Sequence, residues 1–154
     1  MTGRPLERYG VFGGTFDPIH LGHLIAAEHA REALGLARVL FVPARRSPFK
    51  SEGAASDADH RAAMLERAIA GHPAFALHRV DLDRAGPSYT VDTLALLRAE
   101  LDAESVGDGE PAGRGAPVPD GAGRRELVFV LGADAARELP RWRDPEGIAR
   151  LARL

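Results

Sequence analysis

Apolar residues form two kinds of pattern along this chain, and the two kinds alternate. Short continuous runs, such as Val39 to Val42, are typical of strands buried on both faces of a sheet. Longer stretches place apolar residues three or four positions apart, which is the spacing of one helix face. This alternation predicts an α/β fold with an open, doubly wound, mainly parallel sheet and helices on both faces. The predicted strands are 9–12, 39–42, 75–80 and 127–131, and the predicted helices are 21–34, 57–70, 90–101, a short one that reaches 139, and one that begins at 144.

Residues of suitable types stand at the predicted helix ends. Asp57 and Thr90 are predicted N-caps, because their side-chain oxygens can accept hydrogen bonds from the first free backbone N–H groups. Asp144 is a third predicted N-cap, and a proline follows it at the first helical position. Gly35 is the predicted C-cap of the first helix. The core-facing residues predicted for that helix are Leu21, Leu24, Ile25, Ala27 and Leu34.

The segment 105–125 differs from the rest of the chain in composition. It is dense in Gly and Pro and nearly lacks large apolar residues, so it cannot bury enough surface to order itself. An apolar strand resumes at Leu127, and we therefore predict an exposed, flexible insertion at 105–125 within one domain, 1–154. A chain of 154 residues has the size of a single domain with an ordinary core.

The composition argues against several classes of function. The formal net charge is −2 and the sequence pI is about 6.3, whereas a general nucleic-acid-binding domain is usually much more basic. The chain has no cysteine, which excludes disulfides, thiolate metal ligands and a cysteine nucleophile. Residues 1–8 lack the apolar core of a signal peptide, and no apolar run approaches the roughly 18 residues of a membrane span. We therefore expect a cytoplasmic protein that binds neither nucleic acid nor membranes.

One stretch combines several features that suit phosphate chemistry. Gly13 and Gly14 follow the first predicted strand and let the backbone turn tightly beside a ligand. The helix that begins near Leu21 presents free backbone N–H groups and the positive end of its dipole at the same place. His20 and His23 lie three residues apart at that helix start and therefore share a face. A zinc-binding pair is an alternative for these histidines, although the sequence offers no evident third ligand.

A second glycine turn follows the last predicted strand, at Gly132. Ligands bind in open α/β sheets at the carboxyl ends of strands, so we expect both glycine turns to border one crevice. His20, His23 and Asp134 are then predicted to surround that crevice. Asp17 is predicted to hold the first turn by accepting backbone hydrogen bonds, with a catalytic role as the alternative.

Three motifs make the chain resemble a known family. Residues 13–23, GGTFDPIHLGH, resemble the signature of nucleotidyltransferases that carry a His-x-Gly-His motif. Residues 86–94, GPSYTVDTL, and 131–134, LGAD, followed by Trp142, are similar to segments of bacterial nicotinate-nucleotide adenylyltransferases. The resemblance covers nearly the whole chain in the right order. It implies a Rossmann-like nucleotidyltransferase fold.

The resemblance implies an ATP-binding enzyme of NAD biosynthesis. Such an enzyme transfers AMP from ATP to nicotinate mononucleotide and gives deamido-NAD and pyrophosphate. The mononucleotide phosphate would attack in line without a covalent enzyme intermediate, so the protein mainly positions the reactants and stabilises charge. Mg²⁺ would be held mainly by the ATP phosphates and by water.

The resemblance also implies roles for individual residues. His20 and His23 would be catalytic, donating hydrogen bonds to oxygens that gain charge in the transition state. Three of the other implied contacts keep a structural alternative: Asp134 as a helix cap, Trp142 as a core residue and Lys50 as part of a solvated basic loop. Those other contacts are Gly13, Gly14, Thr15 and Lys50 for the ATP phosphates, Gly132 and Asp134 for the adenosine ribose, and Thr90, Trp142 and Arg143 for nicotinate.

The chain departs from the family pattern in two places. The basic loop has Phe49 where the family often has histidine, which removes a polar contact. The family also continues for several tens of residues, through a Ser/Thr-rich motif over the ATP phosphates, whereas this sequence stops at Leu154. We therefore expect a C-terminally truncated fold, an incomplete ATP site with weak or no activity, and an exposed sheet edge that favours association into an oligomer. The alternatives are a related enzyme for nicotinamide mononucleotide or phosphopantetheine, and a non-catalytic nucleotide-binding module.

Overall fold

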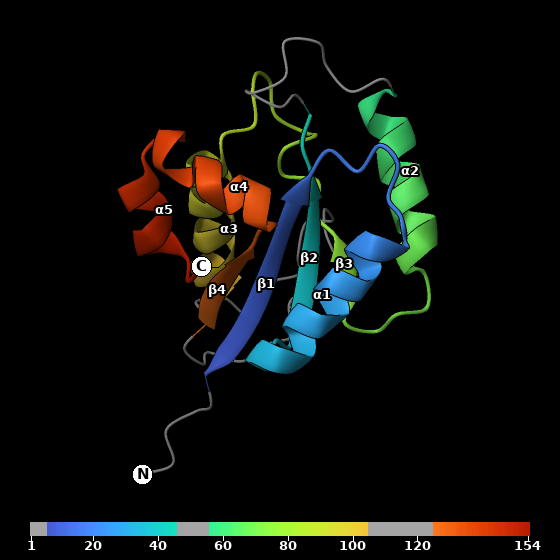
Figure 1. The fold of residues 1–154 in the computed structure, drawn as a ribbon, viewed down its shortest axis with the longest axis horizontal. Helices are drawn as coiled ribbons and strands as arrows, with labels where there is room; N and C mark the ends of the chain where they lie inside the picture. Colours follow the sequence, from blue (N-terminus) through green and yellow to red (C-terminus); the bar gives the residue numbers. More distant parts are fainter. Residues whose placement is uncertain (1–5, 46–55, 105–124) are drawn as a thin grey trace.

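The computed structural model describes residues 6–45, 56–104 and 125–154, which form a four-stranded sheet covered by helices (Figure 1). The strand order is β3-β2-β1-β4, and every pair is parallel. The predicted phosphate contact of Lys50 and the departure from the family pattern at Phe49 lie outside the described residues. So does the predicted insertion, except for Arg125, which begins β4. The strands are β1 (Glu7–Gly14), β2 (Arg38–Pro43), β3 (Phe75–Leu77) and β4 (Arg125–Val130).

Helices cover both faces of the sheet, as the alternation of patterns predicted (Figure 1). Neighbouring residues of β2 point to opposite faces, so Phe41 shares a core cluster with Leu65 of α2 while Leu40 shares another with Leu94 of α3. The predicted doubly wound α/β fold is therefore confirmed. The helices are α1 (Leu21–Leu34) and α2 (Ala58–Ile69) on one face, α3 (Thr90–Glu104) and α5 (Pro145–Leu151) on the other, and α4 (Ala133–Glu138) with the 3-10 helix η1 (Leu139–Arg141) between β4 and α5.

The central strand β1 is longer than its apolar run predicted. It continues through the glycine pair, because Gly13 and Gly14 stay in register with Val42 and Pro43 of β2. The strand β2 is buried from Val39 to Pro43, which confirms the prediction of a strand enclosed on both faces. The glycine pair therefore belongs to the last residues of the sheet and is held by it.

The edge strand β3 is shorter than the predicted strand at 75–80. It pairs with β2 only over Phe75–Leu77, and the backbone N–H of His78 makes one more bond to the Phe41 carbonyl at 2.9 Å. The alternation of apolar and polar residues continues to Val80, but the chain leaves the sheet after His78. It then leads to Asp81, which is buried in a side-chain network with α3.

The first helix has the predicted bounds, and Gly35 is its C-cap in the left-handed conformation, with φ of 61°. The prediction of its core face is largely wrong. Ala27 is fully buried, whereas Leu21 and Ile25 are 73% and 55% exposed, and Leu34 is also exposed. Only Leu24 of the larger predicted residues packs partly against the core. The small Ala27 side chain packs in the core, whereas Leu21, Ile25 and Leu34 turn toward solvent.

Two of the three N-cap predictions are confirmed. The Asp57 carboxylate accepts the His60 backbone N–H at 2.8 Å, and the Asp144 carboxylate accepts that of Gly147 at 2.9 Å. The prediction for Thr90 is wrong, because α3 begins at Thr90 itself and the preceding residue provides the first acceptor carbonyl. The backbone N–H of Thr90 is consequently one of the first donors of α3, which the helix itself does not use.

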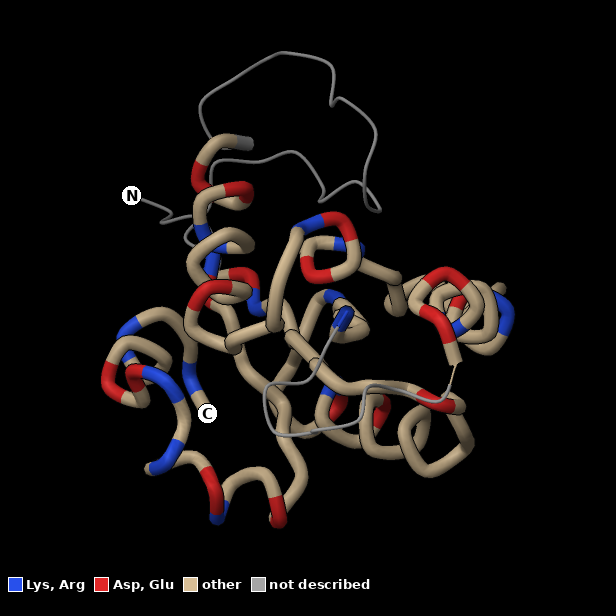
Figure 2. The backbone as a smooth tube through the Cα atoms, turned by 90° about the horizontal axis from the view of Figure 1, so that it is seen from above, with Lys and Arg blue, Asp and Glu red and all other residues tan. Residues whose placement is uncertain are grey.

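Acidic and basic residues are interspersed over the helices (Figure 2). Several of them pair within one helix turn, as Arg31 does with Glu28 at 2.7 Å. Such partly exposed pairs each contribute little to stability. In the described part of the chain, no helix is both long enough and apolar enough to cross a membrane.

Candidate active site

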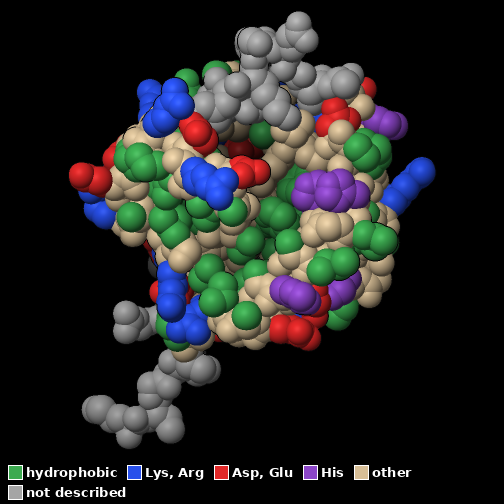
Figure 3. Space-filling view, viewed as in Figure 1, with side chains coloured by type: hydrophobic (Ala, Val, Ile, Leu, Met, Phe, Trp, Pro, Cys, Tyr) green, Lys and Arg blue, Asp and Glu red, His purple; other side chains and the backbone are tan. Residues whose placement is uncertain are grey.

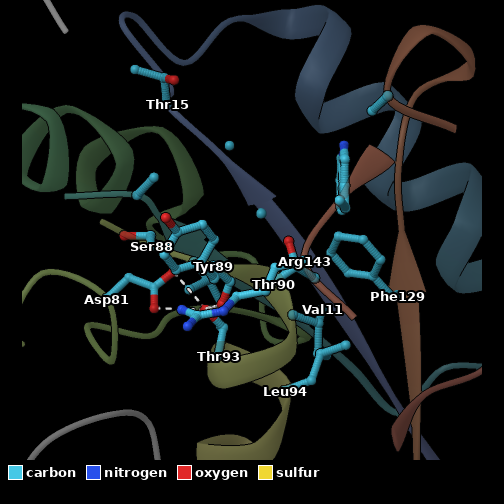
Figure 4. Close-up of a pocket in the computed structure, with 16 residues that line it drawn as sticks. Val11, Thr15, Asp81, Ser88, Tyr89, Thr90, Thr93, Leu94, Phe129 and Arg143 are labelled. Carbon is cyan, nitrogen blue, oxygen red and sulfur yellow. Dashed lines mark hydrogen bonds between the residues drawn. The ribbon is translucent and has the colours of Figure 1, made fainter. Parts of the chain in front are cut away.

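A cavity of about 220 Å³ opens at the carboxyl ends of β1 and β2. Figure 3 shows a hollow on this face whose wall is largely hydrophobic, with histidine side chains on one side of it. The cavity wall is formed by the end of β1, the end of β2, the start of α3 and the segment that follows η1 (Figure 4). Its residues are Val11, Gly13, Gly14, Thr15, Val42, Ala44, Asp81, Ser88, Tyr89, Thr90, Thr93, Leu94, Phe129, Ala135, Trp142 and Arg143.

The turn after β1 forms one end of this cavity. Gly13, Gly14 and Thr15, the three residues predicted to hold phosphate, all line it. A Cβ atom on Gly14 would lie 3.2 Å from the ring of Phe16, so the turn is packed tightly against that ring. Phe16 is 3% exposed and has φ of 49°, a left-handed conformation that is unusual for a non-glycine residue. The backbone of this turn is therefore held in one uncommon shape.

His20 and His23 stand together at the start of α1. Their rings stack with centroids 3.8 Å apart, and the His20 backbone N–H donates to Nδ1 of His23 at 3.2 Å. Because Nδ1 of His23 is an acceptor, the proton of the neutral ring is on Nε2, which can donate to a ligand. Burial lowers the pKa of His23, and the neighbouring His20 lowers it further. Neither imidazole is among the described residues that line the cavity.

The lowered pKa of His23 predicts a dependence of stability on pH. As the pH falls below about 6.5, His23 is protonated to a greater extent in the unfolded chain than in the folded chain, so the free energy of unfolding decreases. The decrease stops once the pH is below the pKa that His23 has in the folded chain. Between about pH 7.5 and pH 5.5, the unfolding free energy of the wild type should fall more than that of His23→Gln, measured by urea denaturation. His29→Gln, on the same helix, is the control, and an equal fall for the wild type and His23→Gln would contradict the prediction.

The other end of the cavity carries the residues predicted to meet nicotinate. Thr90 lies at the start of α3, and the guanidinium carbon of Arg143 lies 4.5 Å from the centroid of the Tyr89 ring (Figure 4). Arg143 also approaches Asp92 at 3.7 Å. The ring of Trp142 meets Phe129 edge-on with centroids 6.1 Å apart, so it packs against the apolar wall while it lines the cavity. An aromatic wall, a guanidinium and helix N–H groups therefore lie side by side.

A buried network at this end of the cavity was not predicted from the sequence. Asp81 is 5% exposed and accepts the Thr93 hydroxyl at 2.7 Å. Two nitrogens of Arg84 donate to the same carboxylate oxygen, at 2.7 and 2.9 Å. One of them also reaches the carbonyl of Tyr89 at 3.5 Å. The only local sign was an aspartate and an arginine three residues apart before the predicted turn at 85–88, a spacing that is common on solvated surfaces.

The residues predicted to meet the adenosine ribose do not line the cavity. Gly132 is the N-cap of α4, and neither it nor Asp134 is among the described residues that line the cavity. The Asp134 side chain is 99% exposed and lies 3.2 Å from Arg137 of the same helix.

Asp17 accepts the backbone N–H of Ser56 at 3.0 Å, as its predicted role in holding the turn requires, although the donor lies 39 residues away.

Comparison with known proteins finds relatives that match nearly the whole chain. A family model described as cytidylyltransferase-like matches residues 11–154. The chain is 46% identical over 149 residues to a protein of Thermomicrobium roseum named "Probable nicotinate-nucleotide adenylyltransferase", covering 97% of this chain and 60% of that protein. It is 42% identical over 147 residues to a protein of the same name from Thermus thermophilus, covering 96% of this chain and 67% of that protein.

A solved structure has the same fold. The nicotinic acid mononucleotide adenylyltransferase of Plasmodium falciparum, complexed with NaAD, superposes with a TM-score of 0.63 at 19% identity. The match covers 91% of this chain and 58% of that one. At this identity the likeness concerns the fold. The chain spans about 60% to 67% of the length of the two curated relatives described above.

Proposed function

The chain belongs to the cytidylyltransferase-like family, and from this premise we propose that it transfers AMP from ATP to nicotinate mononucleotide, giving deamido-NAD and pyrophosphate. The observation that carries the proposal is the cavity itself. It joins a tightly turned glycine pair at one end to an aromatic and cationic group of side chains at the other. A phosphate chain fits the first end, and a pyridine ring with a carboxylate fits the second.

The proposed reaction is a single displacement. An oxygen of the mononucleotide phosphate attacks the α-phosphorus of ATP, the bond from that phosphorus to the β-phosphate oxygen breaks, and pyrophosphate leaves with the bonding electrons. The backbone of Gly13, Gly14 and Thr15 holds the phosphates. His23, neutral near pH 7 because its pKa is lowered, donates from Nε2 to an oxygen that gains charge. His20 donates beside it.

Mg²⁺ fits this site as an ion carried by ATP. In the described residues, no group of three or more His, Asp or Glu side chains could hold a metal ion. A hard cation with oxygen ligands would therefore be held mainly by the phosphates and water, where it neutralises charge on the triphosphate.

At the acceptor end, Trp142 stacks on the pyridine ring in this proposal, while Arg143 and the backbone N–H of Thr90 meet its carboxylate. This arrangement favours the acid over the amide, because an uncharged carboxamide gains less from a guanidinium. Gly132, Asp134 and Lys50 keep their proposed contacts with the ribose and the phosphates. The Asp134 side chain is almost fully exposed, so a ribose can reach it. The cytoplasmic location, the lack of affinity for nucleic acid and membranes, and a possible oligomer remain predictions from the sequence.

Replacing Trp142 by alanine tests the acceptor end. The KM for nicotinate mononucleotide should rise about tenfold or more, since an aromatic stacking contact is worth roughly 1–3 kcal/mol. The KM for ATP should change little. Trp142→Phe, which keeps a ring against Phe129, is the matched control and should lie close to the wild type. Equal changes in both KM values would indicate that Trp142 contributes only to packing of the core and does not contact the acceptor.

One assay tests the whole proposal. The chain is given ATP, Mg²⁺ and one acceptor at a time, and released pyrophosphate is measured for nicotinate mononucleotide, nicotinamide mononucleotide and phosphopantetheine. Release with the first acceptor above the others is expected. Release only with phosphopantetheine would overturn the proposal, since that acceptor has no aromatic ring for Trp142. Binding of ATP and mononucleotide without pyrophosphate would favour the non-catalytic nucleotide-binding module.

A further inference from the structure

Arg61 of α2 is the most buried charged side chain in the described part of the chain, at 1% exposure. Its hydrogen bonds go to backbone carbonyls. Nη1 donates to Thr15 at 2.7 Å, Nε to Ser56 at 3.2 Å and Nη2 to Arg45 at 3.4 Å. A fully buried cation is costly unless its donors are used, and a guanidinium has a planar array of five N–H groups that can serve several acceptors at once.

The three carbonyls belong to three segments that are separate in the sequence. Thr15 follows β1 and lines the cavity, Arg45 follows β2, and Ser56 precedes α2. The Ser56 backbone N–H also donates to the carboxylate of Asp17. The turn after β1 is thus connected to Ser56 by two sets of hydrogen bonds, one through Arg61 and one through Asp17. Both connect the turn to a residue about 40 positions further along the chain.

The turn needs such ties. Phe16, the residue directly after the Thr15 carbonyl, has a left-handed backbone with φ of 49°. A bulky residue keeps this unfavourable conformation only where the surrounding structure holds it there. The shortest hydrogen bond of Arg61 ends on the peptide group between Thr15 and Phe16. It therefore fixes the orientation of the peptide that directly precedes the left-handed residue.

We propose that Arg61 is a positioning residue of the phosphate-binding turn: it holds the Thr15 carbonyl against Arg45 and Ser56, so that the turn keeps the shape that receives the ATP phosphates. This inference rests on the proposed function for its ligand. The local part, that Arg61 holds the turn, can be measured without any ligand.

Hydrogen–deuterium exchange tests the local part. In Arg61→Met, amides of residues 13–17 should exchange about tenfold faster than in the wild type, the order expected for loss of a charge-assisted hydrogen bond. Arg125→Met is the matched control, because Arg125 is also buried and donates to a backbone carbonyl, that of Leu101, but begins β4 at the opposite end of the sheet. Equal exchange at 13–17 in the two variants would overturn the proposal. If Arg61→Met does not fold, Arg61→Lys replaces it: the amides of residues 13–17 should then exchange faster than in Arg125→Met, and equal exchange would overturn the proposal.

Calorimetry with ATP tests the consequence for binding. Arg61→Met should bind ATP about tenfold more weakly than Arg125→Met, with Arg61→Lys between them. Equal affinities would overturn the role in phosphate binding. If the wild type binds ATP but releases no pyrophosphate with any acceptor, the proposed function fails while the ATP comparison still decides the role of Arg61. If the wild type binds no ATP, the ATP-binding part of the proposal is refuted and the exchange rates alone decide whether Arg61 holds the turn.

Discussion

Replacing His20 by alanine is expected to lower turnover about 10²–10³-fold while the protein stays folded. That loss is typical when one preorganised donor to a developing negative charge is removed. The His20 side chain lies at an exposed position and stacks on His23, so its removal takes little from the core. Turnover is measured as pyrophosphate release at saturating substrates, and folding by urea denaturation.

The same variant has a second expected effect, on its neighbour. Because His20 contributes to the lowering of the His23 pKa, its removal should move that pKa back toward its ordinary value, which NMR titration of the ring can follow. His29→Ala, on the same helix, should change neither quantity. Unchanged turnover in His20→Ala would remove this residue from the mechanism.

Replacing Asp81 by alanine is expected to lower the unfolding free energy by roughly 2–4 kcal/mol. The variant leaves the Thr93 hydroxyl and the Arg84 guanidinium without the buried carboxylate that both contact. A loss of this size is a large part of the roughly 5–15 kcal/mol that holds a domain folded. The start of α3 should lose its fixed position, so the KM for the acceptor should rise with little change for ATP.

Two comparisons separate this network from an ordinary ion pair. Asp81→Asn keeps a side-chain oxygen for Thr93 and should lose less stability than Asp81→Ala. Asp59→Asn removes a carboxylate whose side chain is 85% exposed and which also pairs with an arginine, Arg79, and its cost should stay below about 1 kcal/mol. Similar costs for Asp81→Ala and Asp59→Asn, measured by urea denaturation, would show that burial of the network contributes nothing.

Residue types near the helix ends allowed several of those ends to be predicted from the sequence. Helix ends depend on residues within one turn, so Gly35, Asp57 and Asp144 could be assigned from spacing, and the structure agrees. Thr90 failed as a cap because either of two adjacent residues can begin a helix, and only packing selects one. The prediction of the core-facing residues of α1 was wrong for a related reason. Spacing identifies an apolar stripe, but only the packed structure shows which of its residues meet the core: Ala27 is buried and Leu21 is exposed.

The order of strands and helices along the chain, the two-sided sheet and several of the residues that line the cavity could be predicted from the amino-acid sequence. These features follow from apolar periodicity and from glycines at strand ends, which act over a few residues. Which distant groups meet became clear only from the folded chain. Arg61 lies 46 residues from the Thr15 carbonyl that it binds, and Asp81 lies 12 residues from Thr93. No local pattern indicates such partners, because a buried charge takes its partners from whichever segments the packed fold brings around it.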